Sequence, residues 1–211
     1  MIVGNVTEFY RDPFPHGVID DAVADPEKYA FPSHLIGDYR QMTGRGFNKH
    51  HLNEKHSEFA GAIAHEPWKM FYRWVTIGGF KYWCYNGFQK QISAVIPKPK
   101  SGAFPQMEFS AVPAAGGVLT PHTDSKHKIL TVVWYHSGYP AGTKILSGEP
   151  RKKSEPWADE NRTMLVRELA WRPNRMIFFL KTDASWHSVG PLDGPEGEFR
   201  NTVTLNLTAN R

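Results

Sequence analysis

The chain has 211 residues, 40% of them hydrophobic and 22% charged, a composition typical of a folded globular protein and not of a disordered chain. Its net charge of +4 is only mildly basic, and the one local cluster, Arg151, Lys152 and Lys153, is typical of a solvated loop, so we expect no nucleic-acid partner. Neither a leader-like apolar run at the start nor a stretch of roughly 20 apolar residues is present, so we expect no membrane partner and a cytoplasmic location.

The first hundred residues begin with a short element and then lose regularity. Residues 14–21 read as a strand that turns into a helix over residues 22–29, with Asp20 or Asp21 as the helix cap. Residues 38–51 are polar and without periodicity, which indicates an irregular segment.

A helical pattern follows over residues 54–92. Phe59, Ala62 and Ile63 are spaced along one apolar face, and the Gly78-Gly79 pair predicts a break in the helical region. Aromatic residues at this spacing are typical of packing in a core. The single cysteine, Cys84, lies among aromatic residues, so we expect a buried thiol and no internal disulfide.

After a Pro- and Gly-rich turn at residues 97–102 the pattern changes to short apolar runs. These runs are rich in β-branched, aromatic and aliphatic residues and are separated by Gly, Pro and Asp clusters. They cover residues 107–112, 129–135, 164–169, 175–180 and 202–207. Short strands at this spacing predict an antiparallel sandwich or barrel. We expect one domain over residues 1–211, in which residues 1–100 supply a strand and helical support and residues 101–211 most of the β core.

Two histidines in the β half are candidates for metal binding. His122 and Asp124 precede the strand at residues 129–135, and His187 follows the strand at residues 175–180. In extended backbone, residues two apart project from the same face, so His122 and Asp124 can point at one ion. A third ligand must come from elsewhere in the fold, and His187 fits that role.

Two imidazoles and one carboxylate on one face of an octahedron leave three positions open. This arrangement suits Fe(II) enzymes that bind a chelating cosubstrate and O2. A zinc hydrolase commonly carries His-Glu-x-x-His on a helix, and the sequence has no such motif. A lone His-x-Asp is also common in solvated loops, so the order of the neighbouring motifs carries the interpretation.

The last predicted strand adds a candidate site for an anion. Arg200, Thr202 and Thr204 alternate onto one face of it. A guanidinium beside a hydroxyl can hold a terminal carboxylate through paired, charged hydrogen bonds.

The ordered set His122, Asp124, His187 and Arg200 resembles the 2-oxoglutarate and Fe(II)-dependent oxygenases, and most closely their prolyl-4-hydroxylase-like branch. Three stretches extend the resemblance: residues 14–21, 128–135 and 175–189. It is specific over residues 104–208 and loose before them. Two departures concern the pocket rim, Ala141-Gly142-Thr143 in place of a Gly-Gly pair, and Val112 where some relatives have a tyrosine.

The resemblance implies a double-stranded β-helix, or jelly roll, with helices packed on one sheet. It implies that His122, Asp124 and His187 ligate Fe(II) and that Arg200 pairs with the distal carboxylate of 2-oxoglutarate. Tyr135 occupies a position from which some relatives direct a hydroxyl to the same carboxylate, although an ordinary strand aromatic is an equal alternative. Thr202, in preference to Thr204, is the candidate for a further hydroxyl. Ascorbate is an expected supporting reductant.

The expected activity is hydroxylation of an unactivated C–H bond with O2, with release of succinate and CO2. The substrate is a peptidyl prolyl residue or a small metabolite, selected by loops at residues 41–53 and 148–161. Two alternatives stay open: a cupin-like metal enzyme that does not use 2-oxoglutarate, and a non-catalytic jelly-roll binding module.

Overall fold

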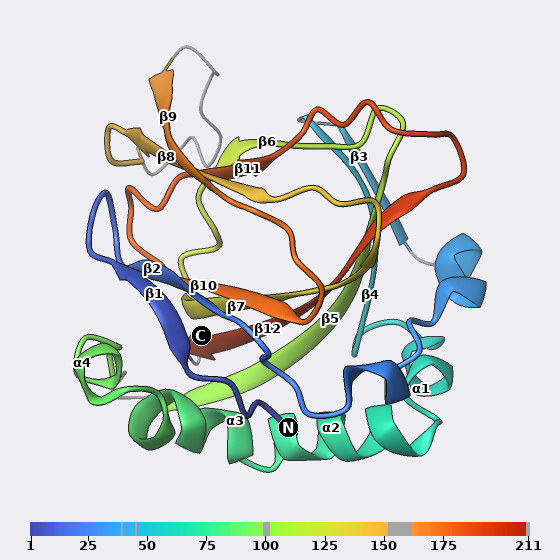
Figure 1. Cartoon of the computed structure of the whole chain (residues 1–211), viewed down its shortest axis with the longest axis horizontal. Helices are drawn as coiled ribbons and strands as arrows, with labels where there is room; N and C mark the ends of the chain where they lie inside the picture. The colour runs from blue at the N-terminus through green and yellow to red at the C-terminus, as the bar shows by residue number, and fades with distance from the viewer. Residues whose placement is uncertain (39, 45, 99–101, 152–161, 210–211) are drawn as a thin grey trace.

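A computed structural model describes residues 1–38, 40–44, 46–98, 102–151 and 162–209. In Figure 1 a curved antiparallel sheet rolls around an interior, and the helices lie along one outer side of it. Within the described residues, no helix is both long enough and apolar enough to cross a membrane. Residues 152–161 of the predicted polar loop, with Lys152 and Lys153, lie outside the described residues.

The described strands are β1 (Val6–Tyr10), β2 (His16–Ile19), β3 (Arg40–Gly44), β4 (Phe47–Asn53), β5 (Ala103–Pro113), β6 (Val118–His122), β7 (Lys128–Gly138), β8 (Thr143–Gly148), β9 (Thr163–Leu169), β10 (Arg175–Leu180), β11 (His187–Val189) and β12 (Phe199–Ala209). Along the sheet they run in the order β1-β2-β10-β7-β12-β5-β4-β6-β11-β8-β9, with β3 paired to β4. All described pairings are antiparallel. The result is the jelly roll with helical support that the sequence predicted.

The helices cover the side of the sheet that faces away from the interior. They are α1 (Phe59–Ala62), α2 (Glu66–Thr76), α3 (Gly79–Tyr82) and α4 (Lys90–Ser93), with a π-helical turn over Trp83–Gly87. The break predicted at Gly78-Gly79 is confirmed, because Gly78 has a φ of 105° and separates α2 from α3. Left-handed backbone of this kind is accessible to glycine at little cost.

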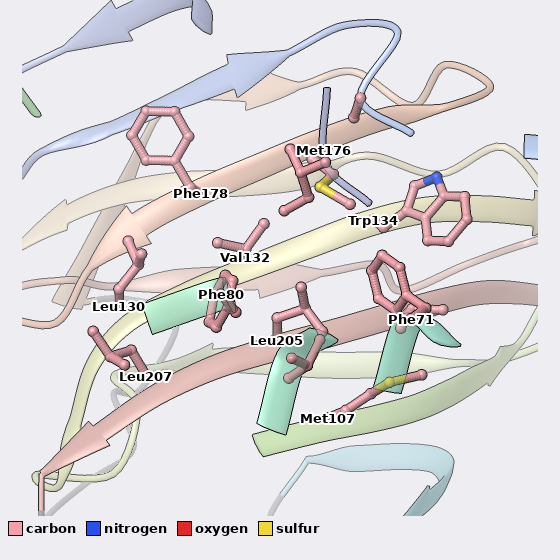
Figure 2. Packing of buried hydrophobic residues seen from close by; sticks show 14 of the residues in the cluster. Phe71, Phe80, Met107, Leu130, Val132, Trp134, Met176, Phe178, Leu205 and Leu207 are labelled. Carbon is pink, nitrogen blue, oxygen red and sulfur yellow. The ribbon is translucent and has the colours of Figure 1, made fainter. Parts of the chain in front are cut away.

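The main core lies between these helices and the outer face of the sheet. Figure 2 shows Phe71 and Phe80 of the helical layer packed against Met107, Val132 and Leu205. Alternate residues of β5, β7, β10 and β12 point to this side, because successive side chains of a strand project to opposite faces. The Cys84 thiol is buried in the same core, as expected.

The inner face of the roll has a different character. Phe14, Tyr135, Ile177 and Phe179 form part of a smaller apolar cluster at one side. The rest of the inner face is polar over β4, β5 and β12, and it lines the pocket described below.

The helix predicted over residues 22–29 is wrong. The backbone N–H of Val23 instead donates to the Asn174 side-chain oxygen at 3.0 Å, and that of Ala22 to the Asn174 carbonyl at 2.9 Å. Asp20 caps no helix, because its carboxylate forms a two-pronged ion pair with Arg175 at 2.6 and 2.9 Å. Only a 3-10 turn, Pro26–Lys28, is helical here.

The irregular segment predicted over residues 38–51 is also wrong, since it forms the β3–β4 hairpin. β4 lies inside the sheet, between β5 and β6. Its side chains at Lys49, His51 and Asn53 point to the polar interior and all reach Glu108. The segment therefore has a polar sequence although it is a strand.

The first and last strands of the sheet order approach each other across the opening of the roll. The Arg167 guanidinium of β9 stacks over the Tyr10 ring of β1, 3.5 Å from its centroid. Beyond this contact, β9 exposes Met164, Leu165 and Val166, which are 73%, 59% and 42% accessible.

Candidate metal centre

The sheet register brings the three predicted metal ligands together. His122 ends β6 and His187 begins β11, and the two residues are direct partners in the β6–β11 pairing. Asp124 follows His122 by two positions. One ligand atom from each of the three residues lies within 4.8 Å of the others, and no other such cluster occurs among the described residues.

Backbone carbonyls fix the chemical form of both histidines. The Nδ1 atom of His122 lies 2.8 Å from the Thr120 carbonyl oxygen, and that of His187 lies 3.0 Å from the Ser185 carbonyl oxygen. A carbonyl only accepts hydrogen bonds, so each Nδ1 carries the proton and each Nε2 carries the lone pair. A hydrogen bond of this kind orients a histidine for metal binding.

The surroundings also keep the imidazoles neutral. Burial, followed by the neighbouring His187, lowers the pKa of His122 to about 3. Burial is also the largest cause that lowers the pKa of His187. The two rings are 4.2 Å apart between centroids, and the Phe179 ring lies 4.3 Å from that of His187. Neutral imidazole is the form that binds a metal ion.

Two donors hold the Asp124 carboxylate. The Thr131 hydroxyl donates to Oδ2 at 2.6 Å, and the Lys128 ammonium lies 2.9 Å from Oδ1. Burial alone would raise the pKa of Asp124, but the charge of Lys128 and the hydrogen bond from Thr131 outweigh it and hold this pKa well below its usual range. Neither Thr131 nor Lys128 was predicted, because nothing local in the sequence marks them as partners of Asp124.

The triad lines a pocket that opens to solvent. Arg200, Thr202 and Thr204 line the same pocket, as does Thr143. The structure therefore brings the predicted metal ligands, the predicted anion-binding arginine and both candidate threonines to one cavity.

Arg200 is buried and held in place by β8 and by the residues just before it. Its Nε donates to the Ala141 carbonyl at 2.6 Å and its Nη2 to the Thr143 hydroxyl at 3.1 Å. Burial lowers the pKa of Arg200 from its usual value, yet a guanidinium stays charged in proteins. Thr143 was missed as a site residue, because its contact with Arg200 joins strands 57 residues apart.

Tyr135 does not line the pocket. Its hydroxyl lies 2.9 Å from the Thr143 hydroxyl and donates to the Leu169 carbonyl at 2.8 Å. The centre of the Arg200 guanidinium is 5.1 Å from the Tyr135 ring centroid. The structure thus places Tyr135 behind Thr143 and Arg200, as a support for the residues that face the cavity.

The donor set fits a divalent metal of the iron type. Two imidazole nitrogens and one carboxylate form a facial set that leaves positions for a chelating ligand and O2. The hydrogen bonds to Nδ1 and to Asp124 supply the outer contacts that such ligands need.

No protein family model matches the sequence, and no curated protein matches it. Solved structures do. A prolyl-4-hydroxylase from Pseudomonas putida aligns at a TM-score of 0.50 and 9% identity, over 93% of this chain and 93% of that one. A Trichoplax adhaerens prolyl hydroxylase, solved with a hypoxia inducible factor peptide fragment, aligns at a TM-score of 0.54 and 13% identity, over 92% of this chain and 83% of that one.

The epimerase SnoN, solved with Fe3+, α-ketoglutarate and nogalamycin RO, aligns at a TM-score of 0.57 and 12% identity, over 92% of this chain and 78% of that one. The fold is that of the 2-oxoglutarate oxygenases. The resemblance read from the motifs is thereby confirmed at the level of the fold, and the neighbours of the 2-oxoglutarate oxygenase fold include both hydroxylases and an epimerase.

Proposed function

We propose that this chain is a 2-oxoglutarate- and Fe(II)-dependent oxygenase. The observation that carries the proposal is the convergence of His122, Asp124 and His187 in one cavity with the buried Arg200. Each part matches one need of the reaction: three ligands for iron, open positions for a keto acid and O2, and a fixed cation for the distal carboxylate.

Bound iron and 2-oxoglutarate supply the oxidising chemistry, in which O2 is consumed and succinate and CO2 are released. The residues of the chain bind and orient. His122 and His187 offer Nε2 to the metal because their Nδ1–H groups donate hydrogen bonds to backbone carbonyls. Thr131 and Lys128 hold Asp124, while Ala141 and Thr143 hold Arg200 at the cosubstrate end.

Hydroxylation of an unactivated C–H bond is the finer proposal. The carboxylate of Asp124 in the third ligand position supports it over halogenation, since this ligand set leaves no open position for a halide beside the cosubstrate and O2. Arg200 favours this reading over a cupin-like enzyme, which has no use for a buried guanidinium beside the metal.

The proposal is tested with Asp124→Ala and His187→Ala. Each should lose Fe(II) binding, measured by equilibrium dialysis, and the conversion of 2-oxoglutarate to succinate should fall to background. Matched controls are Asp183→Ala and His65→Ala, which remove an exposed carboxylate and an exposed imidazole. Succinate release at the wild-type rate in both ligand variants would contradict the assignment.

A further inference from the structure

A second charged cluster lies in the same pocket, away from the metal ligands. The Lys49 ammonium of β4 is 2.9 Å from Oε1 of Glu108 on β5. The other oxygen, Oε2, accepts from His51 Nδ1 at 3.1 Å and from Asn53 Nδ2 at 3.3 Å. The Lys49 and Glu108 side chains are only 16% and 19% exposed, so this ion pair belongs to the interior of the roll.

The sheet register puts this pair at the level of the metal site. Glu108 is the partner of Thr204 on β12, and Thr204 is the partner of Val133 on β7. Val133 is two positions from Thr131, whose hydroxyl holds Asp124. Lys49, Glu108 and Thr204 line the pocket together with the triad.

The charges of the pocket do not cancel. Among the described lining residues, three are cationic (Lys49, Lys128 and Arg200) and two are anionic (Asp124 and Glu108), and three less two leaves one positive charge. A divalent metal adds two positive charges and the dianion 2-oxoglutarate adds two negative charges. Together they leave the net charge of the pocket unchanged. The loaded pocket therefore keeps one positive charge, which favours a ligand that carries one negative charge.

Of the three cations that line the pocket, Lys49 is the one best placed to pair with a negatively charged ligand. Arg200 serves the cosubstrate, and Lys128 holds Asp124, a proposed metal ligand, whereas the carboxylate paired with Lys49 has no part in the metal centre. An ammonium has three donors, and one of those of Lys49 goes to Glu108. Burial alone would raise the pKa of Glu108, but Lys49 and His51 outweigh it and hold that pKa well below its usual range. Glu108 therefore stays ionised and fixes the position of the ammonium.

We propose, on the basis of the proposed function, that Lys49 binds the carboxylate of a small substrate with a single net negative charge, and that Glu108 is its positioning residue. An internal peptidyl prolyl residue brings no charge for Lys49 to meet. The substrate class is thus a small carboxylic acid, and the carbon to be oxidised is set by its distance from that carboxylate.

The first experiment needs no variant. Probes are a set of N-acetyl-L-amino acids, which are mono-anions, and the corresponding N-acetyl-L-amino acid amides, which are neutral and of nearly equal shape. Binding to the wild-type protein loaded with Mn(II) and 2-oxoglutarate under argon is followed by ligand-detected NMR. At least one acid should bind about tenfold or more tightly than its amide, as expected for hydrogen bonds to a charged group. Equal binding of every acid and amide pair would overturn the proposal.

The second experiment compares Lys49→Met, Lys49→Arg and the control Lys69→Met, which removes an ammonium that is 64% exposed. Lys49→Met should abolish the preference for the acid, whereas Lys49→Arg and Lys69→Met should keep it. Lys49 is not the residue that binds the substrate carboxylate if the preference for the acid survives in Lys49→Met. The same holds if that variant weakens the binding of 2-oxoglutarate and not the binding of the acid. Substrate-stimulated succinate release should follow the same order as binding.

Failure of this inference is distinguishable from failure of the proposed function. A wild-type protein that binds Fe(II) and 2-oxoglutarate but treats acids and amides alike refutes only the role of Lys49. A protein that binds neither Fe(II) nor 2-oxoglutarate refutes the oxygenase itself.

Discussion

The two faces of β12 (Phe199–Ala209) have opposite characters. On one face Val203, Leu205 and Leu207 are buried against the helical layer. On the other face, Arg200, Thr202 and Thr204 line the pocket. Successive residues of one strand therefore serve stability and chemistry in turn.

This division teaches where each kind of substitution should act. A change on the helix side removes apolar contacts and acts on folding. A change on the pocket side alters ligand binding and leaves the main core intact. The following predictions test the division, from the largest expected effect to the smallest.

Leu205→Ala should destabilise the protein by about 2–5 kcal/mol, the usual cost of truncating a buried leucine. Its neighbour Thr204→Val, on the pocket side, should change stability by less than about 1 kcal/mol. Denaturant unfolding followed by tryptophan fluorescence measures both. Equal losses in the two variants would mean that the faces of β12 are not energetically separate.

Arg200→Met should raise the Kd for 2-oxoglutarate about 10- to 150-fold, because a charged pair of hydrogen bonds is lost. Calorimetry on the Mn(II)-loaded protein gives this value. Arg73→Met, which removes an exposed guanidinium from α2, is the matched control. An unchanged Kd would assign the distal carboxylate to another cation of the pocket.

Thr131→Val should weaken Fe(II) binding about 10- to 100-fold, as loss of an outer contact to a metal ligand does. The methyl group keeps the shape of the side chain, but the hydrogen bond to Asp124 is gone. Competition against a chelator of known affinity measures the change. Thr204→Val again serves as the control, and a loss of equal size in both variants would show that Thr131 has no special role.

The sequence predicts five strands of the second half and the convergence of the three candidate metal ligands, but not the strands β6, β8 and β11. The strands β7, β10 and β12 have either apolar residues on both faces or a clear alternation of apolar and polar residues. Both patterns can be recognised in the sequence alone. His122 and Asp124 lie two positions apart on extended backbone, so their convergence follows from local geometry.

Other parts depend on contacts between distant segments. β4 reads as irregular because Lys49, His51 and Asn53 face a polar interior, and Leu52 is its one fully buried apolar residue. The partner that makes this sequence a strand is Glu108, at least 55 residues away. Thr143 is likewise recognisable only once Arg200 of another strand lies beside it.

The stacking of Arg167 on Tyr10 has a consequence for solubility. Strands at the ends of a sheet offer unpaired backbone groups to other chains, and a charged side chain on an edge discourages such pairing. Arg167 places a guanidinium where β9 and β1 meet. Its charge disfavours pairing of another chain with that part of the edge. Arg167 does not cover Met164, Leu165 and Val166, which stay exposed. Self-association of this protein at high concentration would therefore begin at the outer half of β9.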